Sequence, residues 1–267
     1  MSQLQAVVFD WAGTVVDHGS LAPMGVFVRA FAEFGVEITL QEARGPMGMA
    51  KRDHIQAVMN LPRVAQAWAE RHGREPAEAD IDRVYEVFVP LNVAVVADHA
   101  TLIEGTAEVV ADLRAKGLKI GSTTGYTREI MAPLLPLAAA QGFAPDSLVC
   151  AGDLPQGRPH PFMMYRTFLE LGVGPAWTVV KVDDTGVGIG EGLAAGTWTV
   201  GVALTGNAFG LSPEATAALD HAEFTARSAK AHGELRAAGA HEVIDSIRDL
   251  PLALARIEGR LARFERP

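Results

Sequence analysis

Three short apolar runs, each followed by polar residues and a glycine, constrain the fold of this chain more than any other feature. The runs are Leu4 to Phe9, Leu118 to Ser122 and Thr178 to Val182. Each pattern is typical of a buried strand that leads into a tight loop. Helical segments lie between the later strands, and strands that alternate with helices form a parallel sheet through right-handed crossovers. The sequence therefore predicts an α/β fold with a Rossmann-like parallel sheet as its core.

The remaining elements of this core follow from the same signals. Further strands are expected at Ser147 to Cys150, Thr197 to Leu204 and His241 to Ile244. Four helices are expected. The first runs to Lys116 with Thr106 as its N-cap, and the second begins at about Thr127. The third runs from Pro161 to Gly172, and the fourth is the short stretch Glu191 to Ala195. The Ala-rich tail after about residue 207 is also expected to be helical and to complete the core.

Residues 20–99 interrupt the alternation of strands and helices. This stretch has helical patterns without a convincing strand, at Met24 to Phe34, Lys51 to Met59, Arg63 to His72 and Asp80 to Leu91. We expect two domains: an α/β core of residues 1–19 and 100–267, and an inserted α-helical cap of residues 20–99 that covers one edge of the sheet.

Composition excludes several classes of function. The chain of 267 residues carries a net charge of −9. A protein that binds the phosphate backbone of a nucleic acid needs a basic patch, so nucleic acid is not expected as the main partner. No apolar run is long enough to span a membrane, and the first residues do not resemble a signal peptide, so we expect a cytoplasmic protein. Cys150 is the single cysteine and is expected to be a small buried side chain. The eight histidines lack the spacing of a zinc site.

Polar residues follow three of the predicted strands. Asp10, Thr124 and the pair Asp183 and Asp184 all stand at carboxyl ends of strands. Parallel sheets of this kind bind their ligands at that edge. We therefore expect these side chains to converge on one site.

These positions resemble the motifs of the haloacid dehalogenase superfamily. The resemblance rests on Asp10-Trp11-Ala12-Gly13-Thr14, on Thr124, on Arg158 in the run GRPHP, and on Asp183-Asp184. It implies that Asp10 attacks phosphorus, that Thr124 and Gly125 bind the phosphoryl group, and that Arg158 adds a fixed cation. It also implies that Asp10, Asp184 and the main-chain carbonyl of Ala12 hold Mg²⁺.

Ala12 departs from the pattern of superfamily phosphatases. Those enzymes carry an Asp at this position, as the general acid that protonates an oxygen leaving group. A methyl group cannot donate a proton. The leaving group is therefore expected to be one that needs no proton on oxygen.

Lys51 is a candidate to stabilise a leaving group that needs no proton on oxygen. It follows the run Gly45-Pro46-Met47-Gly48-Met49-Ala50, early in the predicted cap. A desolvated lysine can lose its proton and condense with an aldehyde to an imine, which accepts the electrons of a breaking P–C bond.

The whole chain is similar to the phosphonoacetaldehyde hydrolase family. The runs FDWAGT, ARGPMG followed by Lys51, IGSTTGYTRE, GRPHP and WTVGV carry this resemblance. It implies a small phosphonate aldehyde as substrate in 2-aminoethylphosphonate degradation, a Schiff base at Lys51, an aspartyl-phosphate at Asp10, and a homodimer. His54, three residues after Lys51, can relay a proton for imine formation, and Met47 and Tyr126 can line the pocket.

Gly188 departs from that family's pattern. The family usually has an Asp at this position, four residues after the metal-binding Asp184, and a Gly where this chain has Asp183. The loss of one carboxylate near the metal can weaken its binding. Asp183 is a candidate to compensate.

Three alternatives stay open at the level of sequence. Gly190 to Ala195 match the G-x-G-x-x-A pattern of dinucleotide-binding proteins, although they begin six residues after Asp184 and no acidic partner follows about 20 residues later. A second alternative is a different superfamily hydrolase, either a phosphatase, which Ala12 disfavours, or a dehalogenase, which needs no metal at Asp184. A third is a binding module that keeps only the fold, which an intact set of Asp10, Thr124, Arg158 and Asp184 disfavours.

Overall fold

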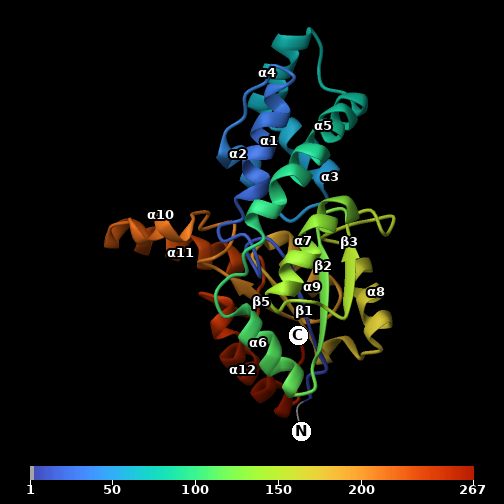
Figure 1. Cartoon of the computed structure of the whole chain (residues 1–267), viewed down its shortest axis with the longest axis vertical. Coiled ribbons are helices and arrows are strands. Elements are labelled where there is room, and N and C mark those ends of the chain that lie inside the picture. Colours follow the sequence, from blue (N-terminus) through green and yellow to red (C-terminus); the bar gives the residue numbers. More distant parts are fainter. Residues whose placement is uncertain (1–2) are drawn as a thin grey trace.

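The computed structural model describes residues 3–267, in which a parallel sheet lies below a lobe of helices (Figure 1). The six strands of the sheet run in the order β3-β2-β1-β4-β5-β6, and all neighbouring pairs are parallel. Their bounds are β1 Ala6–Phe9, β2 Lys119–Thr124, β3 Ser147–Cys150, β4 Val179–Asp183, β5 Trp198–Val202 and β6 Glu242–Ile244. The prediction of a Rossmann-like α/β core is confirmed.

Helices cover both faces of the sheet because its central strands are apolar on both sides. In β1, Val7 and Phe9 pack in the cluster that includes helices α6, α7 and α12, whereas Ala6 and Val8 pack against α8. Helices α9 and α11 pack against β5 on the α8 side. The bounds are α6 Thr106–Ala115, α7 Arg128–Ala140, α8 Phe162–Leu171, α9 Gly186–Ala194, α10 Pro213–Ala217, α11 His221–Ala237 and α12 Leu250–Ala262.

The part of the chain between β1 and β2 that runs from α1 to α5 is helical and forms the upper lobe in Figure 1, whereas α6, which follows it, packs on the sheet. It contains α1 Ala22–Ala32, α2 Leu40–Arg44, α3 Lys51–Met59, α4 Pro62–His72 and α5 Glu78–Val96. We call this lobe the cap and the remainder the core. Placing the domain boundaries at 19/20 and 99/100 stays a prediction. No helix within residues 3–267 combines the length and the apolar character needed to cross a membrane.

Short polar caps fix where the helices near the sheet edge begin. Thr127 accepts a hydrogen bond from Ile130 N at the start of α7, and Thr185 accepts one from Gly188 N at the start of α9. Asp17 accepts hydrogen bonds from the first backbone N–H groups of α1. These caps set the angle at which each helix leaves the edge that carries the polar residues.

Three details of the predicted elements are wrong. Gly105, not Thr106, is the N-cap of α6, and the Thr106 hydroxyl is directed at the carbonyl of Val15 instead. The helix expected at Glu191 to Ala195 begins earlier, at Gly186, because Thr185 caps it. The five-residue helix α2 was not predicted, since it is too short to show a period, although Thr39 and Glu42 form its capping box.

Candidate active site

Asp10 lies immediately after β1, where the strand delivers its carboxylate to the sheet edge. The side chain is 9% exposed, and its Oδ1 lies 2.8 Å from Nη1 of Arg158. Burial and the neighbouring Asp183 raise the pKa of Asp10 to about 6, although Arg158 and Lys181 oppose this shift. The carboxylate is therefore desolvated yet held beside a cation, which suits a nucleophile that must approach a negatively charged phosphoryl group.

Asp184 follows β4 and faces the same space as Asp10. It accepts a hydrogen bond from Asn207 N at 2.7 Å, and within residues 3–267 it forms no ion pair with a cationic side chain. Burial, Asp10 and Asp183 raise the pKa of Asp184 well above its usual value. Oxygens of Asp10, Asp183 and Asp184 lie within 4.8 Å of one another. Such a cluster has excess negative charge, and a divalent cation between Asp10 and Asp184 would relieve it.

Asp183 is engaged away from this cation position. Its Oδ1 accepts hydrogen bonds from the backbone N–H and the hydroxyl of Thr185. Its Oδ2 lies 3.3 Å from Arg158 and 3.1 Å from Lys181. Both oxygens therefore face cationic or N–H and O–H groups of the protein itself, which leaves Asp10, Asp184 and the main chain of Ala12 as the candidate metal ligands.

Gly188 and Asp183 are complementary in space. A Cβ atom added at Gly188 would lie 1.9 Å from Oδ2 of Asp183. The carboxylate of Asp183 therefore fills the place that a side chain at position 188 would enter. The idea that Asp183 compensates for the missing carboxylate at position 188 stays a prediction.

Thr124 and Gly125 end β2 at the same edge. The Thr124 hydroxyl accepts a hydrogen bond from Tyr126 N at 3.1 Å, and its own proton remains available to a ligand. A Cβ at Gly125 would lie 2.6 Å from the carbonyl oxygen of Met49 in the cap. Glycine at position 125 therefore allows the loop before α3 to pack directly against the core.

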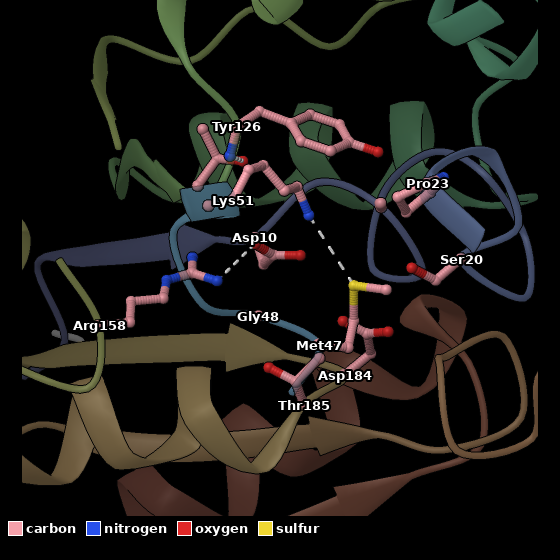
Figure 2. Close-up of a pocket in the computed structure, with 13 residues that line it drawn as sticks. Asp10, Ser20, Pro23, Met47, Gly48, Lys51, Tyr126, Arg158, Asp184 and Thr185 are labelled. Atoms are coloured by element: carbon pink, nitrogen blue, oxygen red, sulfur yellow. Dashed lines mark hydrogen bonds and ion pairs between the residues drawn. The ribbon is translucent and has the colours of Figure 1, made fainter. Parts of the chain in front are cut away.

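Lys51 enters the site from above, as the first residue of α3. Figure 2 shows its Nζ and the Asp10 carboxylate facing one cavity, with Arg158 on the far side of Asp10. The Nζ atom lies 4.0 Å from Sδ of Met47 and 4.9 Å from the centre of the Tyr126 ring. Burial lowers the pKa of Lys51 to about 8, with a partial offset from Asp10. At pH 7 about a tenth of such a lysine is neutral, against about 0.03% at its usual pKa.

The cavity beneath Lys51 is small. Its volume is about 20 Å³, and it is also lined by Ala12, Ser20, Pro23, Thr124 and Thr185. This is room for about one water molecule. A larger molecule can bind only when the cap, or the side chains between cap and core, move.

His54 does not line this cavity, unlike the other predicted site residues. Its ring stacks on Phe27 at 3.9 Å, and Nε2 lies 2.7 Å from the carbonyl oxygen of Ala43. Burial and Lys51 lower its pKa well below the usual value. A neutral ring that donates from Nε2 leaves the lone pair of Nδ1 free, and Nδ1 has no hydrogen-bond partner in the part of the chain that the structure describes. The role of His54 as a proton relay stays a prediction.

Comparison with known proteins identifies the family. The model of the haloacid dehalogenase-like hydrolases matches residues 4–196. Proteins named phosphonoacetaldehyde hydrolase from Paraburkholderia phytofirmans and Klebsiella pneumoniae are 61% and 49% identical to this chain, and both alignments cover 100% of each protein. The crystal structure of a phosphonoacetaldehyde hydrolase-like protein from Oleispira antarctica has a TM-score of 0.97 at 44% identity, covering 99% of this chain and 96% of that one. This chain belongs to the phosphonoacetaldehyde hydrolase family.

More distant structures share the fold alone. A β-phosphoglucomutase from Clostridium difficile has a TM-score of 0.68 at 15% identity. The family model and the full-length relatives, not these distant structures, confirm the resemblance of the sequence to the phosphonoacetaldehyde hydrolase family and to the haloacid dehalogenase-like hydrolases.

The dinucleotide-binding alternative has no support in the structure. The run Gly190 to Ala195 lies inside and at the end of α9, not in the turn between a strand and a helix. Glu191, in the middle of this run, is fully buried among side chains of the core. These glycines therefore lie beyond the first turn of α9, and phosphate is bound by the free N–H groups of a helix's first turn.

Several residues that shape this site do not stand out in the sequence as site residues. Thr123, Lys181 and Glu191 lie buried beneath Arg158, and Ser20 and Pro23 line the cavity. A lysine in the middle of the apolar run VVKVD was the available signal, because a buried cation needs a buried carboxylate nearby. Ser20 and Pro23 gave no comparable signal, since they lie just before α1 and in its first turn, and only the packing of cap on core brings them to the cavity.

Proposed function

We propose that this protein hydrolyses the P–C bond of phosphonoacetaldehyde, giving acetaldehyde and phosphate. The proposal rests on family membership and on one observation above all: a buried lysine and a buried aspartate face one cavity from opposite sides. An ordinary phosphatase has no use for a lysine with a pKa near 8 at this position.

Lys51 begins the proposed reaction at the aldehyde. Its ammonium gives up a proton, the neutral Nζ adds to the carbonyl carbon, and return of that proton to the resulting hydroxyl lets water leave and gives a protonated imine. His54 can take up and return the proton through a water molecule, by way of Nδ1. The ring of Tyr126 and the sulfur of Met47 keep the surroundings of Nζ apolar, which favours the neutral amine before the condensation.

Asp10 then attacks phosphorus in line with the P–C bond. A bond forms between Asp10 Oδ and phosphorus while the electrons of the P–C bond move into the imine, producing an enamine on Lys51 and an aspartyl-phosphate on Asp10. Protonation of the enamine at carbon and hydrolysis release acetaldehyde. Water then cleaves the aspartyl-phosphate. No oxygen leaving group forms in the P–C step, so Ala12 is compatible with this chemistry.

Arg158, Thr124 and Gly125 bind the phosphoryl oxygens in this proposal. Arg158 already lies against Asp10, and the Thr124 hydroxyl has a proton to donate. Asp10, Asp184 and the Ala12 carbonyl would hold Mg²⁺, which would supply positive charge to neutralise the phosphoryl oxygens. We also propose that the protein is a homodimer, with a molar mass in solution of twice the 28.4 kDa of the chain.

The substrate comparison tests this function. The wild type should release phosphate from phosphonoacetaldehyde and not from ethyl phosphate, whose ethoxide leaving group requires the acid that Ala12 lacks. Asp10→Asn should abolish the release, because an amide is nearly isosteric with the carboxylate but is not an anionic nucleophile. Asp153→Asn is a suitable control, since Asp153 pairs with Arg128 outside the cavity. Faster release from ethyl phosphate would instead favour a small-molecule phosphatase.

A further inference from the structure

A network of buried charged groups lies directly beneath Arg158. Lys181 on β4 and Glu191 on α9 are fully buried, and Asp183 completes the set. Nζ of Lys181 lies 3.1 Å from Asp183 and 3.3 Å from Glu191. Desolvating so many charges is costly, and such a group persists only when its members satisfy one another.

Glu191 reaches this place because α9 packs unusually close to the sheet. A Cβ at Gly192 would lie 2.7 Å from Thr199 and 2.8 Å from Cβ of Lys181. At Gly188, one turn earlier, an added Cβ would lie still closer to Asp183, at 1.9 Å from Oδ2. The glycine-rich sequence of α9 therefore brings the helix axis down onto β4 and carries the Glu191 carboxylate under the active site.

Thr123 connects the members of this network. Its hydroxyl donates to Oε2 of Glu191 at 2.7 Å and accepts from Nζ of Lys181 at 2.8 Å and from Nη2 of Arg158 at 3.0 Å. One donor and two acceptor sites are all that a hydroxyl has, so each is used.

The guanidinium of Arg158 is consequently fixed on two of its edges. Nε donates to Oε2 of Glu191 at 3.0 Å, and Nη2 donates to the carbonyl and the hydroxyl of Thr123. Only Nη1 is directed to the site, at 2.8 Å from Oδ1 of Asp10 and 3.3 Å from Oδ2 of Asp183. A planar guanidinium held at Nε and Nη2 has no rotation left by which Nη1 could turn away.

We propose that Glu191 is a positioning residue: together with Thr123 and Lys181 it holds Arg158 so that Nη1 meets Asp10 and the phosphoryl group. This inference rests on the proposed function. Glu191 touches neither the substrate nor the metal-ligand set, and it acts through Arg158 alone. The phosphoryl half of the site, formed by Asp10 and Arg158 in the core, therefore depends on Glu191. The half formed by Lys51 in the cap does not.

Two measurements on Glu191→Gln separate these halves. The first is kcat for phosphate release from phosphonoacetaldehyde. The second is the rate at which borohydride, added with phosphonoacetaldehyde, irreversibly labels Lys51. We expect kcat to fall about 100-fold, the effect of misplacing a reacting group by about 1 Å, while the labelling rate stays within about twofold of wild type.

A double-mutant cycle with Arg158→Lys tests whether Glu191 acts through Arg158. A lysine has no Nε edge for Glu191 to hold, so in that background Glu191→Gln should lower kcat by no more than about twofold further. If the fall in kcat of the double variant equals the product of the falls in the two single variants, the proposal is overturned. An equal loss of phosphate release and of Lys51 labelling in Glu191→Gln would also overturn it. Either result would show a general structural role.

Two further variants distinguish loss of positioning from loss of folding. Glu191→Gln/Lys181→Met removes one negative and one positive buried charge together, and should show the same split between kcat and labelling if the single variant does not fold. Asp80→Asn alters a buried carboxylate paired with Arg74 in the cap and should leave both rates unchanged. A wild type that neither releases phosphate nor labels would overturn the proposed function, and the role of Glu191 with it.

Discussion

At the scale of single residues, Lys51 shows a conflict between stability and chemistry. Its ammonium is buried against Met47, Phe27 and Tyr126, and its pKa is lowered from 10.5 to about 8. A lysine with a lowered pKa in the folded state destabilises the protein below that pKa. The penalty is relieved as the pH rises from about 8 to about 10.5, since the unfolded chain then binds more protons than the folded one.

Replacing Lys51 should therefore make the protein more stable while removing its activity. A shift of this size corresponds to about 3 kcal/mol at neutral pH. We expect Lys51→Met to raise the free energy of unfolding at pH 7 by up to that amount, and the gain over wild type to shrink towards pH 10. Denaturant unfolding at both pH values measures it. A gain that does not depend on pH would show that burial of the charge is not its cause.

At the scale of elements, the connection between α2 and the core decides where Lys51 lies. Arg44, the last residue of α2, donates hydrogen bonds to the carbonyl oxygens of Gly19, Asn207 and Gly210 and to Oδ1 of Asn207. Asn207 N in turn donates to Asp184. One arginine thus ties the cap to the loop that holds a predicted metal ligand.

Arg44→Met should weaken the closed arrangement of cap and core. The variant loses four hydrogen bonds from a charged donor, so we expect a fall of at least about tenfold in the rate of Lys51 labelling at low phosphonoacetaldehyde concentration. High substrate concentration should restore most of the rate. The matched control is Arg63→Met, because Arg63 pairs with Glu42 inside the cap and not with the core. Equal effects of both variants would contradict a role for Arg44 in closure.

The elements themselves were predictable where a local signal existed. The strand that ends at Asp10 and the helix that begins at Lys51 follow from apolar periodicity and flanking residues. Helix α9 was predicted too short, because its glycines hide the helical pattern and their purpose, close packing on β4, is tertiary. Sequence could place Asp10, Thr124 and Asp184 at one sheet edge, but it could not show that Glu191 points inward beneath them.

At the scale of the whole molecule, core and cap both bring cations to a crowded group of carboxylates, the core through Arg158 and the cap through Lys51. Asp10, Asp183 and Asp184 crowd the core edge, and the cap supplies Lys51 above them. The raised pKa values of Asp10 and Asp184 mean that the metal-free protein loses stability as the pH rises through about 4 to 6 and beyond, since carboxylates that were protonated must ionise in a crowded, buried place.

Magnesium should reverse this loss. We expect Mg²⁺ to raise the melting temperature by several degrees at pH 7.5 and much less at pH 5, where protons compete for the same carboxylates. Asp184→Asn should remove the response to Mg²⁺ and raise the melting temperature of the metal-free protein at pH 7.5. Thermal unfolding at matched ionic strength makes the measurement. An equal Mg²⁺ effect at both pH values would argue against binding at these carboxylates.

The most direct test of the whole account is covalent capture of the imine. Borohydride added with phosphonoacetaldehyde should inactivate the wild type irreversibly and leave a reduced adduct on Lys51 in the peptide map, whereas borohydride alone should do little. Lys51→Arg should show no adduct and should lose many powers of ten in phosphate release, because a guanidinium stays protonated and each 1.36 kcal/mol of lost stabilisation costs about tenfold in rate. Near-normal phosphate release by Lys51→Arg, or an adduct on a different lysine, would contradict the mechanism.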